Sequence, residues 1–162
     1  MDTYFELRLV SYGELDLVRS FYRSYIGKPG STWNEYYPNE EILQEDFVTQ
    51  NLYGLYKNEK LIGAISVSSE NHLSNLPCWA INNNVKEIAR VVISESHQGL
   101  GYGATMLELL FSNLRQQGTT AIHLLVSLDN DSAKHLYRKF NIENRGQFFL
   151  YEHNYYALEA RI

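Results

Sequence analysis

Residues 86–104 read Lys86-Glu-Ile-Ala-Arg-Val-Val-Ile-Ser-Glu-Ser-His-Gln-Gly-Leu-Gly-Tyr-Gly-Ala104, and this stretch predicts the centre of the fold. The segment Ile88 to Ile93 is rich in apolar and β-branched residues, which favours a strand that is covered on both faces. Beyond the stretch, apolar residues recur at helical spacing in Leu107, Leu110, Phe111 and Leu114. A helix over 101–117 would therefore bury one stripe against a core.

Three glycines, Gly99, Gly101 and Gly103, separate the predicted strand from the predicted helix. Glycine lets the backbone turn sharply and approach a ligand closely, because no Cβ is in the way. The free N–H groups of a first helical turn, together with the positive end of the helix dipole, attract an anion. The loop therefore predicts a phosphate-binding site, and the alternative is a tight structural turn without a ligand.

The rest of the chain predicts an α/β fold. We expect strands at 4–10, 52–56, 61–67, 121–127, 142–151 and 155–161, and further helices from Ser11, which Glu14 helps to cap, from Asn39, and from 129 or 130. Residues 57–60 predict a type I-like hairpin turn, and the polar residues 68–84 predict an irregular connection. Only the two strands that flank the 101–117 helix must be parallel, since a right-handed crossover joins them. The sheet is therefore expected to be mixed.

The length of 162 residues favours a single domain over residues 1–162. A net charge of −5 argues against a nucleic-acid partner. Residues 1–84 hold six basic and eleven acidic residues, which favours a cationic partner or reflects a solvated acidic surface. The first twenty residues are too charged for a signal peptide, and no apolar run approaches about 18 residues. We therefore expect a cytoplasmic protein that does not enter the membrane.

Metal chemistry is not indicated by the sequence. The histidines show no metal-ligand spacing with one another or with the single cysteine, Cys78, so no metal site is expected.

The glycine loop is compatible with two kinds of anion site. Gly99, Gly101 and Ala104 satisfy G-x-G-x-x-A, the dinucleotide fingerprint, between a strand and a helix. A dinucleotide fold, however, normally needs further βα units and an acidic residue about 20 positions on, whereas Asp129 lies beyond that point. An NAD-dependent oxidoreductase is the less favoured alternative.

When Gln98 is included, the loop Gln98-Gly-Leu-Gly-Tyr-Gly103 resembles the pyrophosphate loop of the GNAT acyltransferase family. Downstream, Asn130-x-x-Ala-x-x-x-Tyr137-x-x-Phe140 resembles a second segment of that family, although the family's glycine before the phenylalanine is absent. The resemblance covers nearly the whole chain. It implies the GNAT fold, a mostly antiparallel mixed sheet of about six to seven strands with about four helices, and acetyl-CoA as co-substrate.

The resemblance also implies how the donor is held. The backbone of Val91, Val92 and Ile93 would bind the pantetheine arm. The diphosphate would lie against Gln98, Gly99, Leu100, Gly101, Tyr102, Gly103 and Ala104, where N–H groups make charge-assisted bonds to anions. Asn130 would either contact the cofactor or cap its own helix.

Tyr137, by resemblance, is the acid that protonates the coenzyme A sulfur, and its alternative role is core packing. The family's glutamate in the fifth strand is replaced by Leu125. Glu87, predicted on the same strand face as Ala89 and Val91, is the remaining candidate for a general base acting through water. Alternatively, Glu87 pairs with Lys86 or Arg90, and a desolvated amine loses its proton without a dedicated base.

The acceptor is expected to bind through aromatic and acidic residues of one loop. Trp33, Glu35, Tyr36 and Tyr37 lie where the family borders its acceptor cleft, and such residues suit an amine. They would otherwise cover a sheet edge. The expected activity is acetyl transfer from acetyl-CoA to a small-molecule or peptide primary amine in a ternary complex. The alternative is a non-catalytic acyl-CoA sensor on the same fold. A homodimer formed through the last strands is compatible with the sequence.

Overall fold

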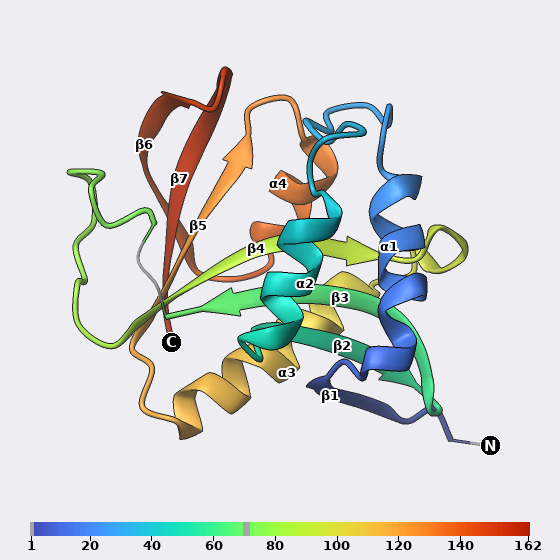
Figure 1. Ribbon diagram of the computed structural model, residues 1–162. Coiled ribbons are helices and arrows are strands. Elements are labelled where there is room, and N and C mark those ends of the chain that lie inside the picture. Colours follow the sequence, from blue (N-terminus) through green and yellow to red (C-terminus); the bar gives the residue numbers. More distant parts are fainter. Residues whose placement is uncertain (1, 70–71) are drawn as a thin grey trace.

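The computed structural model describes residues 2–69 and 72–162 and is built around one mixed β-sheet (Figure 1). In chain order the elements are β1 (Phe5–Leu9), a 3₁₀ turn (Tyr12–Glu14), α1 (Leu15–Ser24), α2 (Glu40–Val48), β2 (Leu52–Lys57), β3 (Lys60–Ser68), β4 (Val85–Ile93), a second 3₁₀ turn (Glu95–His97), α3 (Tyr102–Gln116), β5 (Ala121–Ser127), α4 (Asp131–Tyr137), β6 (Ile142–Leu150) and β7 (His153–Arg161).

The strands lie in the order β1-β2-β3-β4-β5-β7-β6. Within the described residues, β4 and β5 form the only parallel pair, and α3 connects them as predicted. The other neighbouring strands are antiparallel. This arrangement confirms a mixed sheet, and it lacks the consecutive parallel strands that a dinucleotide fold requires.

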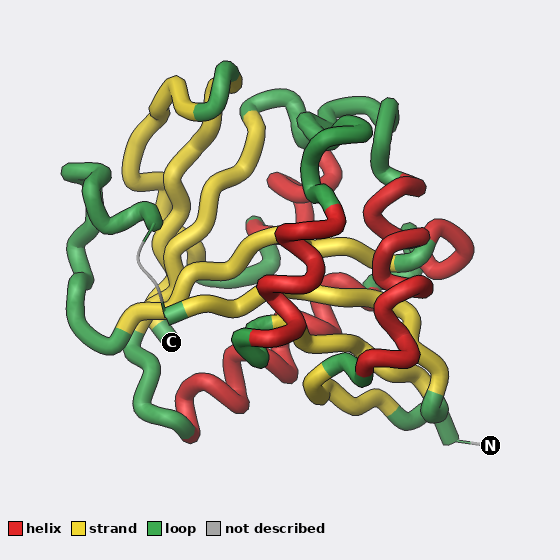
Figure 2. The backbone as a smooth tube through the Cα atoms, in the orientation of Figure 1, coloured by secondary structure: helices red, strands yellow, loops and turns green. Residues whose placement is uncertain are grey.

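Helices cover both faces of the sheet (Figures 1 and 2). On one face, α1 and α2 bury Val18, Phe21 and Leu43 against β2, β3 and β4. On the other face, α3 contributes its apolar stripe to a larger core that also includes Tyr137 of α4. The stripe predicted for α3 is buried in full, with Leu107, Leu110, Phe111 and Leu114. The core therefore lies on both sides of the central strands, which explains why their sequences are apolar throughout.

Several element ends follow local rules that the sequence contains. Ser11 and Glu14 form the expected capping box, although a 3₁₀ turn precedes α1 there. The side chain of Asn39 caps α2 by accepting a hydrogen bond from Ile42 N–H at 2.9 Å. Residues 69 and 72–84, between β3 and β4, form the expected irregular connection, whereas Ser68, which was expected in it, ends β3; residues 70 and 71 lie outside the described part of the chain.

The two hairpin turns differ from the expectation. Between β2 and β3, Asn58 and Glu59 both have positive φ, 48° and 72°. Positive φ at both central residues is the signature of a type I′ turn, so the type I-like expectation is wrong. The twist of a type I′ turn matches the twist of paired strands. Between β6 and β7, Tyr151 and Glu152 also have positive φ, so β7 starts two residues earlier than predicted, at His153.

Candidate active site

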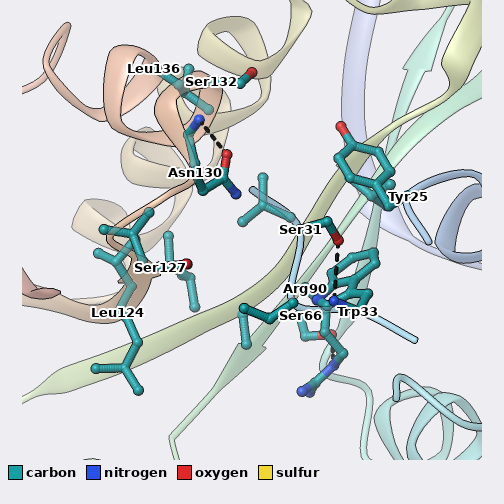
Figure 3. A pocket seen from close by; sticks show the side chains of 18 of the residues that line it. Tyr25, Ser31, Trp33, Ser66, Arg90, Leu124, Ser127, Asn130, Ser132 and Leu136 are labelled. Atoms are coloured by element: carbon teal, nitrogen blue, oxygen red, sulfur yellow. Dashed lines mark hydrogen bonds between the residues drawn. The ribbon is translucent and has the colours of Figure 1, made fainter. Parts of the chain in front are cut away.

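The sheet opens between its two parallel strands. Strand β4 pairs with β5 only at Val85↔Ala121, Lys86↔Ile122 and Glu87↔His123, although both strands continue for several residues. Beyond Glu87 the strands diverge, and a cavity of about 1150 Å³ lies along them. Figure 3 shows Leu124 and Ser127 of β5 on one side of this cavity and Arg90 on the other. The splayed strands place backbone polar groups where a ligand can reach them.

A β-bulge in β4 shapes one wall of the cavity. Ala89 pairs with Ser66 and Val92 pairs with Ala64, so β4 has one more residue than β3 over this interval. Arg90 has a φ of 51°, which is the left-handed region. The extra residue shifts the alternation of faces, because side chains alternate strictly only along an unbroken strand. Val91 therefore packs with the α3 side of the core, whereas Val92 packs with the α1 side. The expectation that Glu87 and Val91 share a face is wrong.

The bulge also decides which backbone groups face the cavity. Ser94 N–H donates to Ile62 O, so alternate residues of β4, including Val92, direct their polar groups to β3. The groups of Val91 and Ile93 point to the opening instead. The carbonyl of Ile93 already accepts a hydrogen bond from the Gln98 side chain at 3.0 Å. Of the three residues expected to hold the pantetheine arm, Val91 therefore presents its backbone most directly to the cavity.

The glycine loop borders the same cavity at the start of α3. Gly99 and Gly101 have φ values of 76° and 84°, which an L side chain rarely adopts. Gly101 is the N-cap of α3 and has no side chain that could occupy the free N–H groups of the first turn. The lining includes Gln98, Gly99, Gly101, Tyr102, Gly103 and Ala104, whereas Leu100 is 60% exposed and does not contribute to it. This geometry suits an anion bound by main-chain N–H groups.

Asn130 and Tyr137 belong to α4 and its entrance. The side chain of Asn130 accepts a hydrogen bond from Ala133 N–H at 3.0 Å, so it caps α4, and it also lines the cavity (Figure 3). Tyr137 is buried, lines the cavity and packs in the core. Burial raises the pKa of Tyr137, and nearby Tyr25 raises it further. The phenol is therefore protonated at neutral pH, as a proton donor must be.

Glu87 lies on the cavity wall at the point where β4 and β5 separate. The residue is 6% exposed, and its carboxylate accepts a hydrogen bond from Leu73 N–H. His72 Nδ1 lies 3.5 Å from Glu87 Oε2. Arg90, one of its expected partners, instead binds Asp46. The carboxylate is thus held in place by the 69–84 connection while its side chain reaches the cavity.

The four residues expected at the acceptor end divide into two pairs. Trp33 lines the cavity, and its ring packs against Tyr22 and Tyr25 with centroid distances of 5.4 Å. Tyr37 also lines the cavity, and its hydroxyl accepts a hydrogen bond from Arg90 at 3.1 Å. Glu35 and Tyr36 are exposed and do not line it.

Sequence reasoning missed several polar residues of the cavity, and Tyr25, Asp46 and Arg90 are three of them. Asp46 interrupts the apolar stripe of α2, and Arg90 interrupts an otherwise apolar strand. The sequence therefore contained a sign that each of them has a specific role. A charged residue at a core position is expected to have a specific partner. Tyr25 gave no such signal, because a tyrosine fits an apolar helix stripe without further explanation.

Two further kinds of feature are absent from the described residues. No group of His, Cys, Asp or Glu side chains in residues 2–69 and 72–162 could hold a metal ion. In the same residues, no helix is both long enough and apolar enough to span a membrane.

Comparison with known proteins gives consistent matches. A model of the acetyltransferase (GNAT) family matches residues 16–142. Among solved structures, an acetyltransferase of the GNAT family from Streptococcus agalactiae has a TM-score of 0.83 and 18% identity over 99% of both chains. The PaiA N-acetyltransferase from Thermoplasma acidophilum, solved with coenzyme A, has a TM-score of 0.73 and 17% identity over 98% of this chain and 99% of that one.

The ribosomal-protein-S18-alanine N-acetyltransferase from Escherichia coli has a TM-score of 0.72 and 13% identity over 98% of this chain and 94% of that one. At such low identities the likeness shows the fold and does not identify an acceptor. No curated protein matches the sequence.

Proposed function

The chain belongs to the acetyltransferase (GNAT) family and is an N-acetyltransferase, and we propose that residues 1–162 form one domain that transfers an acetyl group from acetyl-CoA to a primary amine by direct attack. The single observation that carries this proposal is the shared cavity. The glycine loop, the free edge of β4, Tyr137 and Glu87 all line it. A donor and an acceptor bound there would meet without a covalent enzyme intermediate. Cys78 does not line the cavity, so no acyl-cysteine is proposed.

The donor is proposed to lie along β4, with its diphosphate at the start of α3. Main-chain N–H groups of residues 99–104 would bind the phosphate oxygens, and Val91 would bind the pantetheine arm. Gln98 supports this wall by fixing the Ile93 carbonyl at the end of β4. Three of the expected donor contacts have smaller roles in this proposal. The side chain of Leu100 is exposed, the polar groups of Val92 face β3, and the side chain of Asn130 is already bonded to Ala133 N–H.

The proposed reaction has one bond-forming and one bond-breaking step. The lone pair of the neutral amine attacks the thioester carbonyl carbon, and the C–S bond then breaks. Tyr137 gives its proton to the departing sulfur, while Glu87 takes the amine proton through water. The products are the N-acetylated amine and coenzyme A as its thiol. Proton exchange with solvent restores the phenol of Tyr137 and the carboxylate of Glu87.

The acceptor is proposed to enter at the end of the cavity remote from the glycine loop. Glu45 and Glu152 join Glu87 in the lining of the cavity, and Trp33, Tyr37 and Tyr155 supply ring faces. Carboxylates attract an ammonium group, and aromatic faces bind cations through their quadrupole. Glu35 and Tyr36 lie outside the lining and would contact only an acceptor that extends beyond the cavity. A small-molecule or peptide amine fits this chemistry.

The test is release of coenzyme A thiol from acetyl-CoA across a panel of primary amines, with Tyr137→Phe as the variant. Loss of the proton donor is expected to lower kcat about 10²-fold and to leave the KM for acetyl-CoA unchanged. Tyr22→Phe is the matched control, because Tyr22 is also buried but does not line the cavity. Acetyl-CoA binding without amine-dependent thiol release would instead identify a non-catalytic acyl-CoA sensor.

A further inference from the structure

Arg90 adopts a backbone conformation that is unusual for its residue type and position. Its φ of 51° is in the left-handed region, in the middle of a central strand. Such a conformation persists in a residue with a side chain only when the surroundings fix it. Glycine would be the expected residue at this bulge. The presence of arginine therefore requires a specific interaction that fixes the bulge.

The guanidinium of Arg90 supplies that interaction. Nε donates to Asp46 Oδ2 at 2.8 Å, and Nη2 donates to Asp46 Oδ1 at 2.9 Å, which is a bidentate pair. Nε also lies 3.3 Å from Ser66 Oγ, and the Ser66 hydroxyl donates to Asp46 Oδ2 at 2.6 Å. The side chains of Arg90 and Asp46 are 16% and 10% exposed. Water therefore screens this pair far less than it screens a surface pair.

The contacts of Arg90 connect three parts of the molecule. Asp46 belongs to α2, Ser66 belongs to β3, and Tyr37, whose hydroxyl accepts a hydrogen bond from Arg90 Nη1, belongs to the loop between α1 and α2. Figure 3 shows the Arg90 side chain next to Ser66 at the cavity wall. The adjacent residue, Val91, is the one whose backbone faces the opening. The pair thus fixes β4 immediately beside the proposed donor contact.

We propose that the Arg90–Asp46 pair is a positioning device that holds the β4 bulge in the conformation that binds the acetyl donor. This inference rests on the proposed function, because it concerns the same donor site. Arg90 acts through the backbone of β4 and is a positioning residue, without contact to the reacting atoms. Its charge is balanced by Asp46, so it does not attract an anionic acceptor.

The test compares Arg90→Ala with Arg90→Gly by calorimetric titration with coenzyme A. If the bulge is retained in only one tenth of Arg90→Ala molecules, the apparent Kd rises about tenfold. Arg90→Gly is expected to recover most of the lost affinity, because glycine adopts positive φ without a side-chain anchor. Arg19→Ala is the control: Arg19 also forms a bidentate pair with a residue of α2, Glu40, but outside the cavity lining.

The outcomes separate the inference from the proposed function. Wild-type protein that fails to bind coenzyme A would contradict the proposed function. Wild-type binding with equal losses in Arg90→Gly and Arg90→Ala, or with no loss in either, would overturn the positioning role. A raised KM for the acceptor with an unchanged Kd for coenzyme A would also overturn it. Asp46→Asn provides a second variant if Arg90→Ala does not fold, and the expected result is a weaker version of the same loss in coenzyme A affinity.

Discussion

The Glu159 carboxylate connects three parts of the chain. Glu159 lies on β7, across β5 from the start of β4. It accepts hydrogen bonds from His123 Nε2 at 2.8 Å and from the N–H groups of Ile81 and Ala80 at 3.0 and 3.3 Å. The ring of Trp79 stacks on His123 with a centroid distance of 3.8 Å. A buried carboxylate of β7 thereby fixes the 69–84 connection, whose other end holds Glu87 in place through Leu73.

Glu159→Gln is expected to destabilise the fold by about 2 kcal/mol at neutral pH, because buried donors lose a charged acceptor. Burial alone would raise the pKa of Glu159, but the hydrogen bonds from Ile81, His123 and Ala80 lower it below 4.5. The folded state therefore holds this proton less tightly than the unfolded state, so stability is present above pH 4.5 and is lost as the pH falls through the folded pKa.

Urea unfolding at several pH values measures this effect. The wild type should lose more stability in acid than Glu159→Gln does. Glu143→Gln is the control, since Glu143 is the cross-strand neighbour of Glu159 but is exposed. Parallel acid losses in wild type and Glu159→Gln would contradict the assigned role.

At the scale of single residues, the sequence predicted Tyr137, Glu87 and most of the glycine loop as neighbours, and the structure gathers them around one cavity. These predictions depended on local patterns and on a family resemblance. The Arg90–Asp46 pair escaped prediction, because the partners are 44 positions apart and their pairing follows from how α2 crosses the sheet. Glu35 and Tyr36 were predicted at the site but do not line the cavity. Loop residues that are adjacent in sequence can point in different directions.

At the scale of elements, the loop between α1 and α2 lines the cavity and contacts the turn between β5 and α4. Gly30 has a φ of 78°, and a Cβ built on it would lie 2.3 Å from Asp129 O. Figure 3 shows Ser31 of this loop between Asn130 on one side and Trp33 on the other. Gly30 therefore permits the close approach of this loop to the turn between β5 and α4.

Gly30→Ala is expected to be at least 1 kcal/mol more destabilising than Gly27→Ala, because only the former adds overpacking to backbone strain. Gly27 has a φ of 77° and nothing within 4 Å of a built Cβ, so it isolates the cost of the left-handed conformation. Chemical denaturation gives the two values. In an activity assay, Gly30→Ala should also raise acetyl-CoA hydrolysis without acceptor, because a displaced loop admits water. Equal stabilities for the two variants would show that the loop does not rest on Asp129.

The same scale explains which elements the sequence could predict. Strands and helices with strong periodicity, such as β5 and α3, were predicted nearly to their ends, because their patterns are local. The bulge at Arg90 was not predicted, since it inserts one residue into a strand that otherwise alternates normally. The type I′ turn at Asn58 and Glu59 was missed because Glu59 occupies a left-handed position that usually favours Asn or Gly.

At the scale of the whole molecule, both halves of the chain line one cavity. The glycine loop, β5 and α4 come from the second half of the chain and line the part of the cavity where we propose that the donor binds. The α1–α2 loop and α2 come from the first half, where the acidic excess lies, and also line the cavity; we propose that the acceptor binds beside them. Donor binding should accordingly depend on backbone shape around α3, whereas acceptor choice should depend on side chains near α2. Coenzyme A binding is thus expected to stabilise the whole fold by mass action.

Coenzyme A at about 100 times its Kd should stabilise the wild type by about 2.7 kcal/mol. For a domain of this size, that corresponds to a rise in Tm of about 5–10 °C, and NAD should give no comparable rise.

Gly101→Ala is expected to abolish most of the coenzyme A shift, because alanine disfavours the φ of 84° that shapes the loop. Gly118→Ala is the matched control: Gly118 has a φ of 88° and an open Cβ position, but lies beyond the other end of α3. Both variants should lower the Tm of the free protein similarly, and only Gly101→Ala should lose the shift. A full shift in Gly101→Ala would mean that the donor does not bind at the start of α3.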